Sequence, residues 1–298
     1  MTSPGAADAA FGGRPFEPAF RPFDAVLAWY FVTVGALVLL FAREVPHSTQ
    51  GVLLHAGGAL AALLLPVAAR ALPAWGALAV RFVLAYLLVF VAFRALGGIV
   101  EFVSPDDREW HLIALDRRIF GTDPTRALGA VASPALTELL QVVYASFYLL
   151  PVVLGLALAR AGKWRAFEFC LTAVALGFLL SYLGYLLVPA RGPERFLPHD
   201  RPLEGIAAAA GLRLWIDRVE PIKRDCFPSG HAEVSFLVAA LAWRFHRPAF
   251  RLLGPVAALL AFSTVYLRYH YAVDVLAGAA LAAGTLLATG RLMAPVRG

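Results

Sequence analysis

Two histidines and an aspartate in the last quarter of the chain have the residue types and spacing for chemistry on a phosphate group. His231 closes the run Pro-Ser-Gly-His at 228–231, and His270 stands four residues before Asp274. If His270 and Asp274 lie on a helix, this spacing puts them on one face. A carboxylate bonded to one imidazole nitrogen fixes the tautomer and makes the other nitrogen a better nucleophile. The second imidazole is suited to protonate a leaving group.

Anion-binding groups accompany the histidines. Ser229 is a good helix N-cap, and Gly230 permits a ligand to approach the backbone of the first turn, where N–H donors are unpaired. Arg191 and Arg195 follow an apolar run, and Arg268 stands just before His270. A planar, permanently charged guanidinium binds phosphate in a bidentate manner. Without the histidines, these arginines would be interpreted as anchors for lipid headgroups.

Long apolar stretches must position these residues. The chain has 298 residues, of which 60% are hydrophobic and 15% charged, a composition typical of an integral membrane protein. The sequence therefore predicts an all-α, polytopic membrane helical bundle of about eight spanning helices. The apolar stretches cover residues 24–42, 51–70, 76–100, 134–159, 165–188, 229–245, 250–267 and 271–290.

The domain organisation follows from these stretches. Residues 1–23 are expected to form a disordered tail, residues 24–75 two accessory helices, and residues 76–298 the core. The segment 105–130 is too charged to span, and an interfacial helix or a lid fits it better. The third stretch contains two arginines: Arg81 is expected to reach the interface by snorkelling, and Arg94 to snorkel or to pair with Glu101.

Loop charges predict the orientation. The turns at 160–165 and 244–251 carry arginine and lysine without acids, which places them in the cytoplasm by the positive-inside rule. With an even number of spans, the histidines then lie on the extracytoplasmic face. The net charge of +6 is explained by these loops, so no nucleic-acid partner is expected. The two cysteines lack metal-ligand spacing, and neither a metal nor another cofactor is expected.

Three blocks, in their order along the chain, resemble the type 2 phosphatidic acid phosphatase superfamily: a basic block at a helix end, Pro-Ser-Gly-His, and His-x-x-x-Asp. The resemblance implies a six-helix core and a phosphohistidine mechanism on a lipid phosphate or phosphodiester. It assigns the nucleophile to His270, its orientation to Asp274 and the general acid to His231. It also implies phosphate binding by Ser229, Gly230, Arg195, Arg191 and Arg268.

The chain departs from the superfamily pattern at two places. Thr264 stands where the third block usually has an arginine, and Val188 stands where the first block usually has a lysine. These departures, with the segment Asp-Arg-Arg-Ile-Phe-Gly at 116–121, resemble the inositolphosphotransferase-like branch, which includes inositol phosphorylceramide synthases. That branch often has Ser-Leu-His where this chain has Ser-Gly-His.

Several alternatives remain open from the sequence. Water as acceptor makes the protein a phosphatase, whereas an alcohol such as inositol makes it a transferase. A membrane transporter of anions or lipids is a further possibility, but the polar residues gather at helix ends on one side, not at the bilayer midplane. A non-catalytic membrane protein is less consistent with both histidines and Asp274 being present. The expected partners are a lipid phosphate substrate and membrane lipids, in a bacterial inner or plasma membrane, and the oligomeric state is open.

Overall fold

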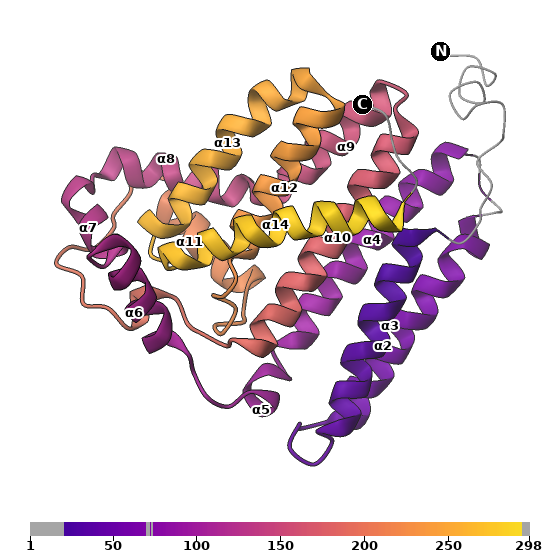
Figure 1. Cartoon of the computed structure of the whole chain (residues 1–298), viewed down its shortest axis with the longest axis horizontal. Helices are drawn as coiled ribbons and strands as arrows, with labels where there is room; N and C mark the ends of the chain where they lie inside the picture. Colours follow the sequence, from indigo (N-terminus) through magenta and orange to yellow (C-terminus); the bar gives the residue numbers. More distant parts are fainter. Residues whose placement is uncertain (1–20, 70–71, 73, 294–298) are drawn as a thin grey trace.

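The computed structural model describes residues 21–69, 72 and 74–293, and within this part the regular structure is helical, without strands (Figure 1). Seven stretches are long and apolar enough to cross a membrane, which confirms the polytopic helical bundle. They are formed by α2 (Pro22–Leu40), α3 (Ser48–Ala69), α4 (Ala74–Leu96), the consecutive α8 (Pro134–Ala145), η2 (Ser146–Leu149) and α9 (Leu150–Arg160), then α10 (Trp164–Leu187), α13 (Arg247–Tyr266) and α14 (Ala272–Leu292).

The remaining expected stretch, 229–245, forms a shorter helix, α12 (Gly230–Phe245), of 16 residues. A helix of this length is about 24 Å long, below the usual span of a bilayer core. It packs against α10, α13 and α14, and most of its side chains are buried. Because protein surrounds α12, it can be shorter than its neighbours without exposing its ends to lipid.

The first two helices form a hairpin beside the rest of the bundle. Helices α2 and α3 pack along each other, with α2 also against α10 and α3 against α4. Most of the tail expected at 1–23 lies outside the described residues. Arg81 of α4 is 4% exposed and binds Asp24 of α2 at 3.0 Å, so the expectation that Arg81 snorkels is wrong. A buried charge that loses its partner is costly, and this pair therefore ties the hairpin to α4.

Short elements cover one end of the bundle. They are α5 (Val100–Val103), α6 (Glu109–Phe120), α7 (Pro124–Ala127), η1 (Leu128–Val131), η3 (Pro193–Arg195) and α11 (Ala209–Val219). Helix α6 packs against the start of α14 and buries Leu112, Ile113 and Asp116. Arg94, near the end of α4, donates to the carbonyl of Arg218 at 3.3 Å instead of pairing with Glu101.

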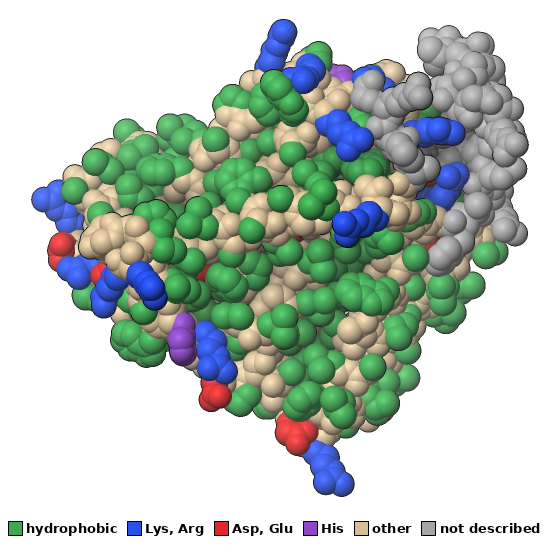
Figure 2. All heavy atoms as spheres, in the orientation of Figure 1, with side chains coloured by type: hydrophobic (Ala, Val, Ile, Leu, Met, Phe, Trp, Pro, Cys, Tyr) green, Lys and Arg blue, Asp and Glu red, His purple; other side chains and the backbone are tan. Residues whose placement is uncertain are grey.

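The surface has the charge distribution expected of a membrane protein. Hydrophobic side chains cover most of the flank visible in Figure 2. Near the end that carries the α12–α13 turn, lysine and arginine side chains have few acidic side chains beside them, whereas toward α6 and the lower edge acidic and basic side chains are mixed. The end with the mixed charges is the one that α6 and its neighbouring short elements cover, and it also contains the two histidines.

Candidate active site

The motif at 228–231 forms the start of α12, as its residue types predict. Ser229 is the N-cap and accepts a hydrogen bond from the N–H of Ala232 at 3.2 Å. A Cβ atom on Gly230 would lie 2.4 Å from Oη of Tyr185 on α10, so a larger residue would push the two helices apart. The glycine therefore allows α12 to begin directly against α10, with His231 as its second residue.

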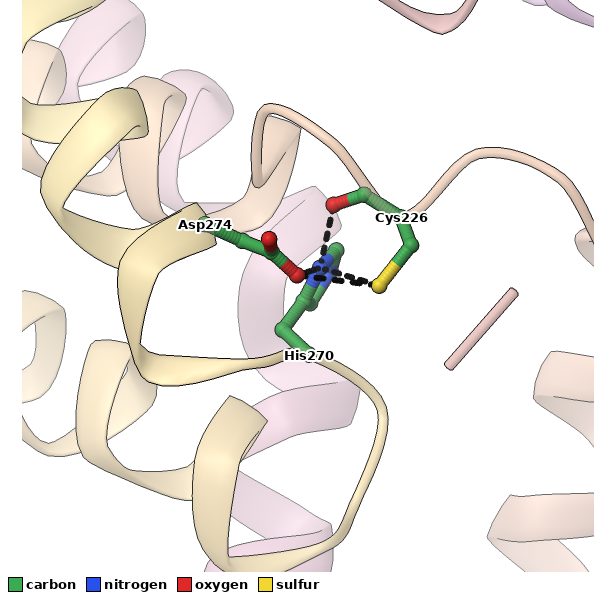
Figure 3. Close-up of side chains that lie close together, drawn as sticks. All are labelled: Cys226, His270 and Asp274. Carbon is green, nitrogen blue, oxygen red and sulfur yellow. Dashed lines mark hydrogen bonds and ion pairs between the residues drawn. The ribbon is translucent and has the colours of Figure 1, made fainter. Parts of the chain in front are cut away.

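His270 lies in the turn before α14, which begins at Ala272. The expectation that His270 and Asp274 share a helix face is therefore wrong. Nδ1 of His270 lies 2.8 Å from the carbonyl oxygen of Cys226 and 3.5 Å from Oδ2 of Asp274 (Figure 3). A carbonyl only accepts, so Nδ1 carries the proton and Nε2 keeps its lone pair. The second nitrogen is thus available as a nucleophile.

Asp274 supports the turn that holds His270. Its carboxylate is fully buried and accepts hydrogen bonds from the Tyr271 N–H at 2.8 Å and from the Cys226 thiol at 2.9 Å. Burial and the nearby Asp274 carboxylate raise the pKa of Cys226, so its sulfur remains a thiol donor. The ligand atoms of Cys226, His270 and Asp274 lie within 4.8 Å of one another, close enough to hold a metal ion. The donors named above bind Oδ2 of Asp274, whereas its Oδ1 has no hydrogen-bond partner among the described residues.

His231 has a different set of neighbours. Its ring centroid lies 5.9 Å from that of His270, and Tyr144 stacks on it at 4.4 Å. Nε2 lies 3.2 Å from Oε1 of Glu220, a residue that follows α11 and also accepts a hydrogen bond from the Tyr148 hydroxyl. Burial by itself would raise the pKa of Glu220, but the charge of His231 and the hydrogen bond from Tyr148 hold it below its usual value.

Glu220 is a site residue that the sequence did not reveal. It belongs to no motif and lies in the long loop between α10 and α12. In the sequence, Glu220 is simply an acidic residue in a loop after a short amphipathic stretch. Acidic residues in such loops are common at protein surfaces, so nothing marks this one as part of a site. The fold of the loop brings it to the histidine.

Of the five residues expected to bind phosphate, Gly230, Arg195 and Arg268 line the cavity that contains both histidines. Arg268 is 7% exposed, donates through Nη2 to the carbonyl of Arg201 at 2.7 Å, and has no hydrogen-bond partner for Nε among the described residues. Burial lowers the pKa of Arg268, and Glu194 acts in the opposite direction. A buried guanidinium with a free donor beside two imidazoles is suited to an anion.

The other two residues do not line this cavity. Arg191 binds Asp107 at 3.5 Å, and its N–H donates to Glu109 at 2.8 Å. The Ser229 hydroxyl caps α12 instead of facing the cavity. Arg191 points away from the cavity because two acids of the segment 105–130, Asp107 and Glu109, bind it. The pattern of apolar residues did not predict where that segment lies, so this contact was not expected.

That segment also fixes the start of α14. Asp116 on α6 accepts hydrogen bonds from the N–H groups of Val273 at 2.7 Å and Ala272 at 3.0 Å. Burial raises the pKa of Asp116 to about 6, although the two N–H donors act against this shift. The first turn of a helix has unpaired donors, and here a carboxylate from a distant part of the chain binds them. Asp116 therefore holds the turn next to His270.

Comparison with known proteins agrees with the geometry. The family model of the PAP2 superfamily matches residues 110–288. A PA-phosphatase related-family protein of Dictyostelium discoideum is 36% identical over 98 residues, which cover 31% of this chain and 18% of that relative. The match thus covers less than a fifth of the relative. No solved structure matches the chain.

Proposed function

We propose that this chain, which belongs to the PAP2 superfamily, is an integral membrane phosphatase or phosphotransferase that acts on a lipid phosphate. The observation that carries the proposal is the pair of imidazoles 5.9 Å apart with unequal partners. His270 has Nδ1 bound to a backbone carbonyl, whereas His231 has Nε2 beside the carboxylate of Glu220. One ring is arranged to attack and the other to transfer a proton.

In the proposed first step, Nε2 of His270 attacks phosphorus. The P–N bond forms while the P–O bond to the lipid alcohol breaks, and His231 gives a proton to the leaving oxygen. Arg268, Arg195 and the backbone N–H groups at the start of α12 stabilise the negative charge on the phosphoryl oxygens. In the second step, His231 takes a proton from the acceptor, whose oxygen attacks phosphorus and breaks the P–N bond.

Water as acceptor gives hydrolysis, and an alcohol such as inositol gives transfer. Two of the carboxylates that line the cavity, Glu220 and Asp225, support transfer as a second candidate because they can accept hydrogen bonds from a polyol. Burial and the charge of Glu220 raise the pKa of Asp225 to about 7, so Asp225 is only partly ionised at neutral pH, whereas Glu220, whose pKa is lowered, remains charged.

We also propose that the site faces away from the cytoplasm. The turn between α12 and α13 and the turn between α9 and α10 carry arginine and lysine and lie at the opposite end of their helices from the histidines. Positively charged short loops remain in the cytoplasm during insertion. Seven stretches have spanning length, and the proposal requires that the shorter α12 also crosses.

The test is a product screen on the purified protein with radiolabelled lipid phosphates, with and without inositol. Free phosphate identifies a phosphatase, and a labelled inositol phosphate identifies a transferase. His270→Ala and His231→Ala should each abolish turnover, and label should be found on His270 in wild-type protein quenched with an alkaline denaturant, because the P–N bond of a phosphohistidine is labile in acid. Turnover that persists in His270→Ala would refute the nucleophile assignment.

A further inference from the structure

The cavity that contains both histidines continues from the membrane surface into the spanning part of the helical bundle. It has a volume of about 350 Å³ and is lined by the histidines and by apolar side chains of α4, α9 and α10. On α10, the lining residues recur on one helix face and are Phe167, Cys170, Leu171, Val174, Ala175, Phe178, Tyr182 and Tyr185. From Tyr185 to Phe167 a helix rises about 27 Å, close to the roughly 30 Å of a hydrocarbon core.

The lining changes from polar to apolar along this length. The end at His231 and His270 has Arg195, Arg268 and Lys223. Tyr182 and Tyr185 follow; Tyr86 lies deeper, with its ring 5.6 Å from that of Phe82 and its hydroxyl donated to the carbonyl of Tyr148 at 2.8 Å. The far end is apolar. This order matches an amphiphile with its charged group at the histidines.

The far end is formed by three residues from three helices. The rings of Phe82 on α4 and Phe167 on α10 lie 6.0 Å apart. Gly155 on α9 faces both rings, and a Cβ atom there would lie 3.3 to 3.4 Å from them. Aromatic rings and a tight glycine thus limit the depth of the channel. A length of about 27 Å with a volume of about 350 Å³ gives a narrow channel, which suits one extended chain.

The channel also has a side opening toward the lipid. Leu87 and Phe90 on α4 line the cavity, and they are 52% and 43% exposed on the apolar flank. They lie within the spanning part of α4, where the surroundings are hydrocarbon. Pro151, Leu154 and Gly155 of α9 line the cavity as well, so a hydrocarbon chain can enter beside α4, on the side of α9, without passing through water.

We infer that this channel binds a single long hydrocarbon chain of the substrate, which enters from the bilayer beside α4, on the side of α9, and extends to Phe82, Gly155 and Phe167. The inference rests on the proposed function in taking the occupant to be the chain of a phosphate ester. It adds that the enzyme selects substrates by chain length along α10, and that the substrate moves laterally from the bilayer into the protein.

Val174→Trp tests the channel at about 16 Å below Tyr185, on the lining face of α10. The substrates are hexyl, decyl and oleyl phosphate. Hexyl phosphate ends above Val174 and should react as in the wild type, which also shows that the variant is folded. Oleyl phosphate should lose about 5- to 160-fold in kcat/KM, equivalent to the 1–3 kcal/mol cost of overfilling an apolar site.

The matched control is Leu156→Trp. Leu156 is next to Gly155 on α9 but is 49% exposed on the outer surface and does not line the cavity, so all three substrates should be unaffected. If Val174→Trp reduces hexyl and oleyl phosphate turnover equally, or neither, the channel does not hold the chain.

A second measurement is independent of turnover. Oleyl phosphate with a diazirine at the chain end is photolysed with His270→Ala protein in detergent. Mass spectrometry should locate the label near Phe82, Gly155 or Phe167, and Val174→Trp in the same background should abolish it. Labelling confined to outer residues such as Leu156 would overturn the inference. Deep labelling without any turnover by the wild type would support the channel and count against the proposed chemistry.

Discussion

Glu220→Gln removes the charge beside His231 while keeping nearly the same shape. Oε1 of Glu220 lies 3.2 Å from Nε2 of His231, and the side chains are 14% and 12% exposed, so solvent screens the pair little. The amide can still accept the hydrogen bond from Tyr148. The change therefore isolates the electrostatic contribution of the carboxylate to the proposed general acid.

Nε2 of His231 has no hydrogen-bond partner among the described residues, so the carboxylate acts through its charge at 3.2 Å; the loss should not exceed that of a hydrogen bond to a charged group, roughly 1.5–3 kcal/mol. This corresponds to about 10- to 160-fold in kcat/KM, which reaches only the lower end of the 10²–10⁴-fold that general acid catalysis typically contributes, as expected for a residue that assists the acid. The loss should depend on the leaving group. An alkyl phosphate needs a proton on its departing oxygen, whereas para-nitrophenyl phosphate has a stable leaving anion and should be affected far less.

The assay is kcat/KM for decyl phosphate and para-nitrophenyl phosphate in wild type, Glu220→Gln and His231→Ala. In the proposed mechanism, kcat/KM reports substrate binding and the step that releases the alcohol, but not the later transfer to the acceptor. Asp217→Asn is the matched control, because Asp217 lines the same cavity but binds Lys223 at 2.6 Å; its effect should be small and equal for both substrates. Equal losses for both substrates in Glu220→Gln would refute the reasoning that Glu220 acts through proton transfer by His231.

Two further predictions concern the short elements that cover this end of the bundle. Asp116→Ala should leave the N–H groups of Ala272 and Val273 without their acceptor, and the loss of a helix cap costs roughly 0.5–2 kcal/mol of stability. Both Tm and kcat should therefore fall. An unchanged kcat would show that the start of α14 does not depend on α6. A cysteine introduced at Pro198 should react with an impermeant thiol reagent in intact cells, and labelling only after lysis would invert the proposed orientation.

The sequence predicted the features that depend on local pattern. Apolar stretches of spanning length gave the bundle, because backbone groups in hydrocarbon must be paired within helices. Ser229 and Gly230 predicted the start of α12, since capping depends on neighbouring residues. The pairing of Arg81 with Asp24 was missed because the partner lies 57 residues away. The same applies to Asp116, which caps a helix from 156 residues away; no spacing rule relates such positions.

The two histidines are chemically the same, and their expected difference in function comes from what the fold places beside each. A backbone carbonyl of the loop before α12 holds Nδ1 of His270, and α6 fixes the turn that follows through Asp116. The end of α11 supplies the carboxylate beside His231. All three contributions, the loop carbonyl, α6 and the end of α11, therefore come from segments outside the spanning helices and outside the motifs. A chain that kept the three motifs but lost α6 or the end of α11 would retain both imidazoles without the partners that distinguish the proposed nucleophile from the proposed acid. The covering segments are therefore part of the proposed catalytic unit.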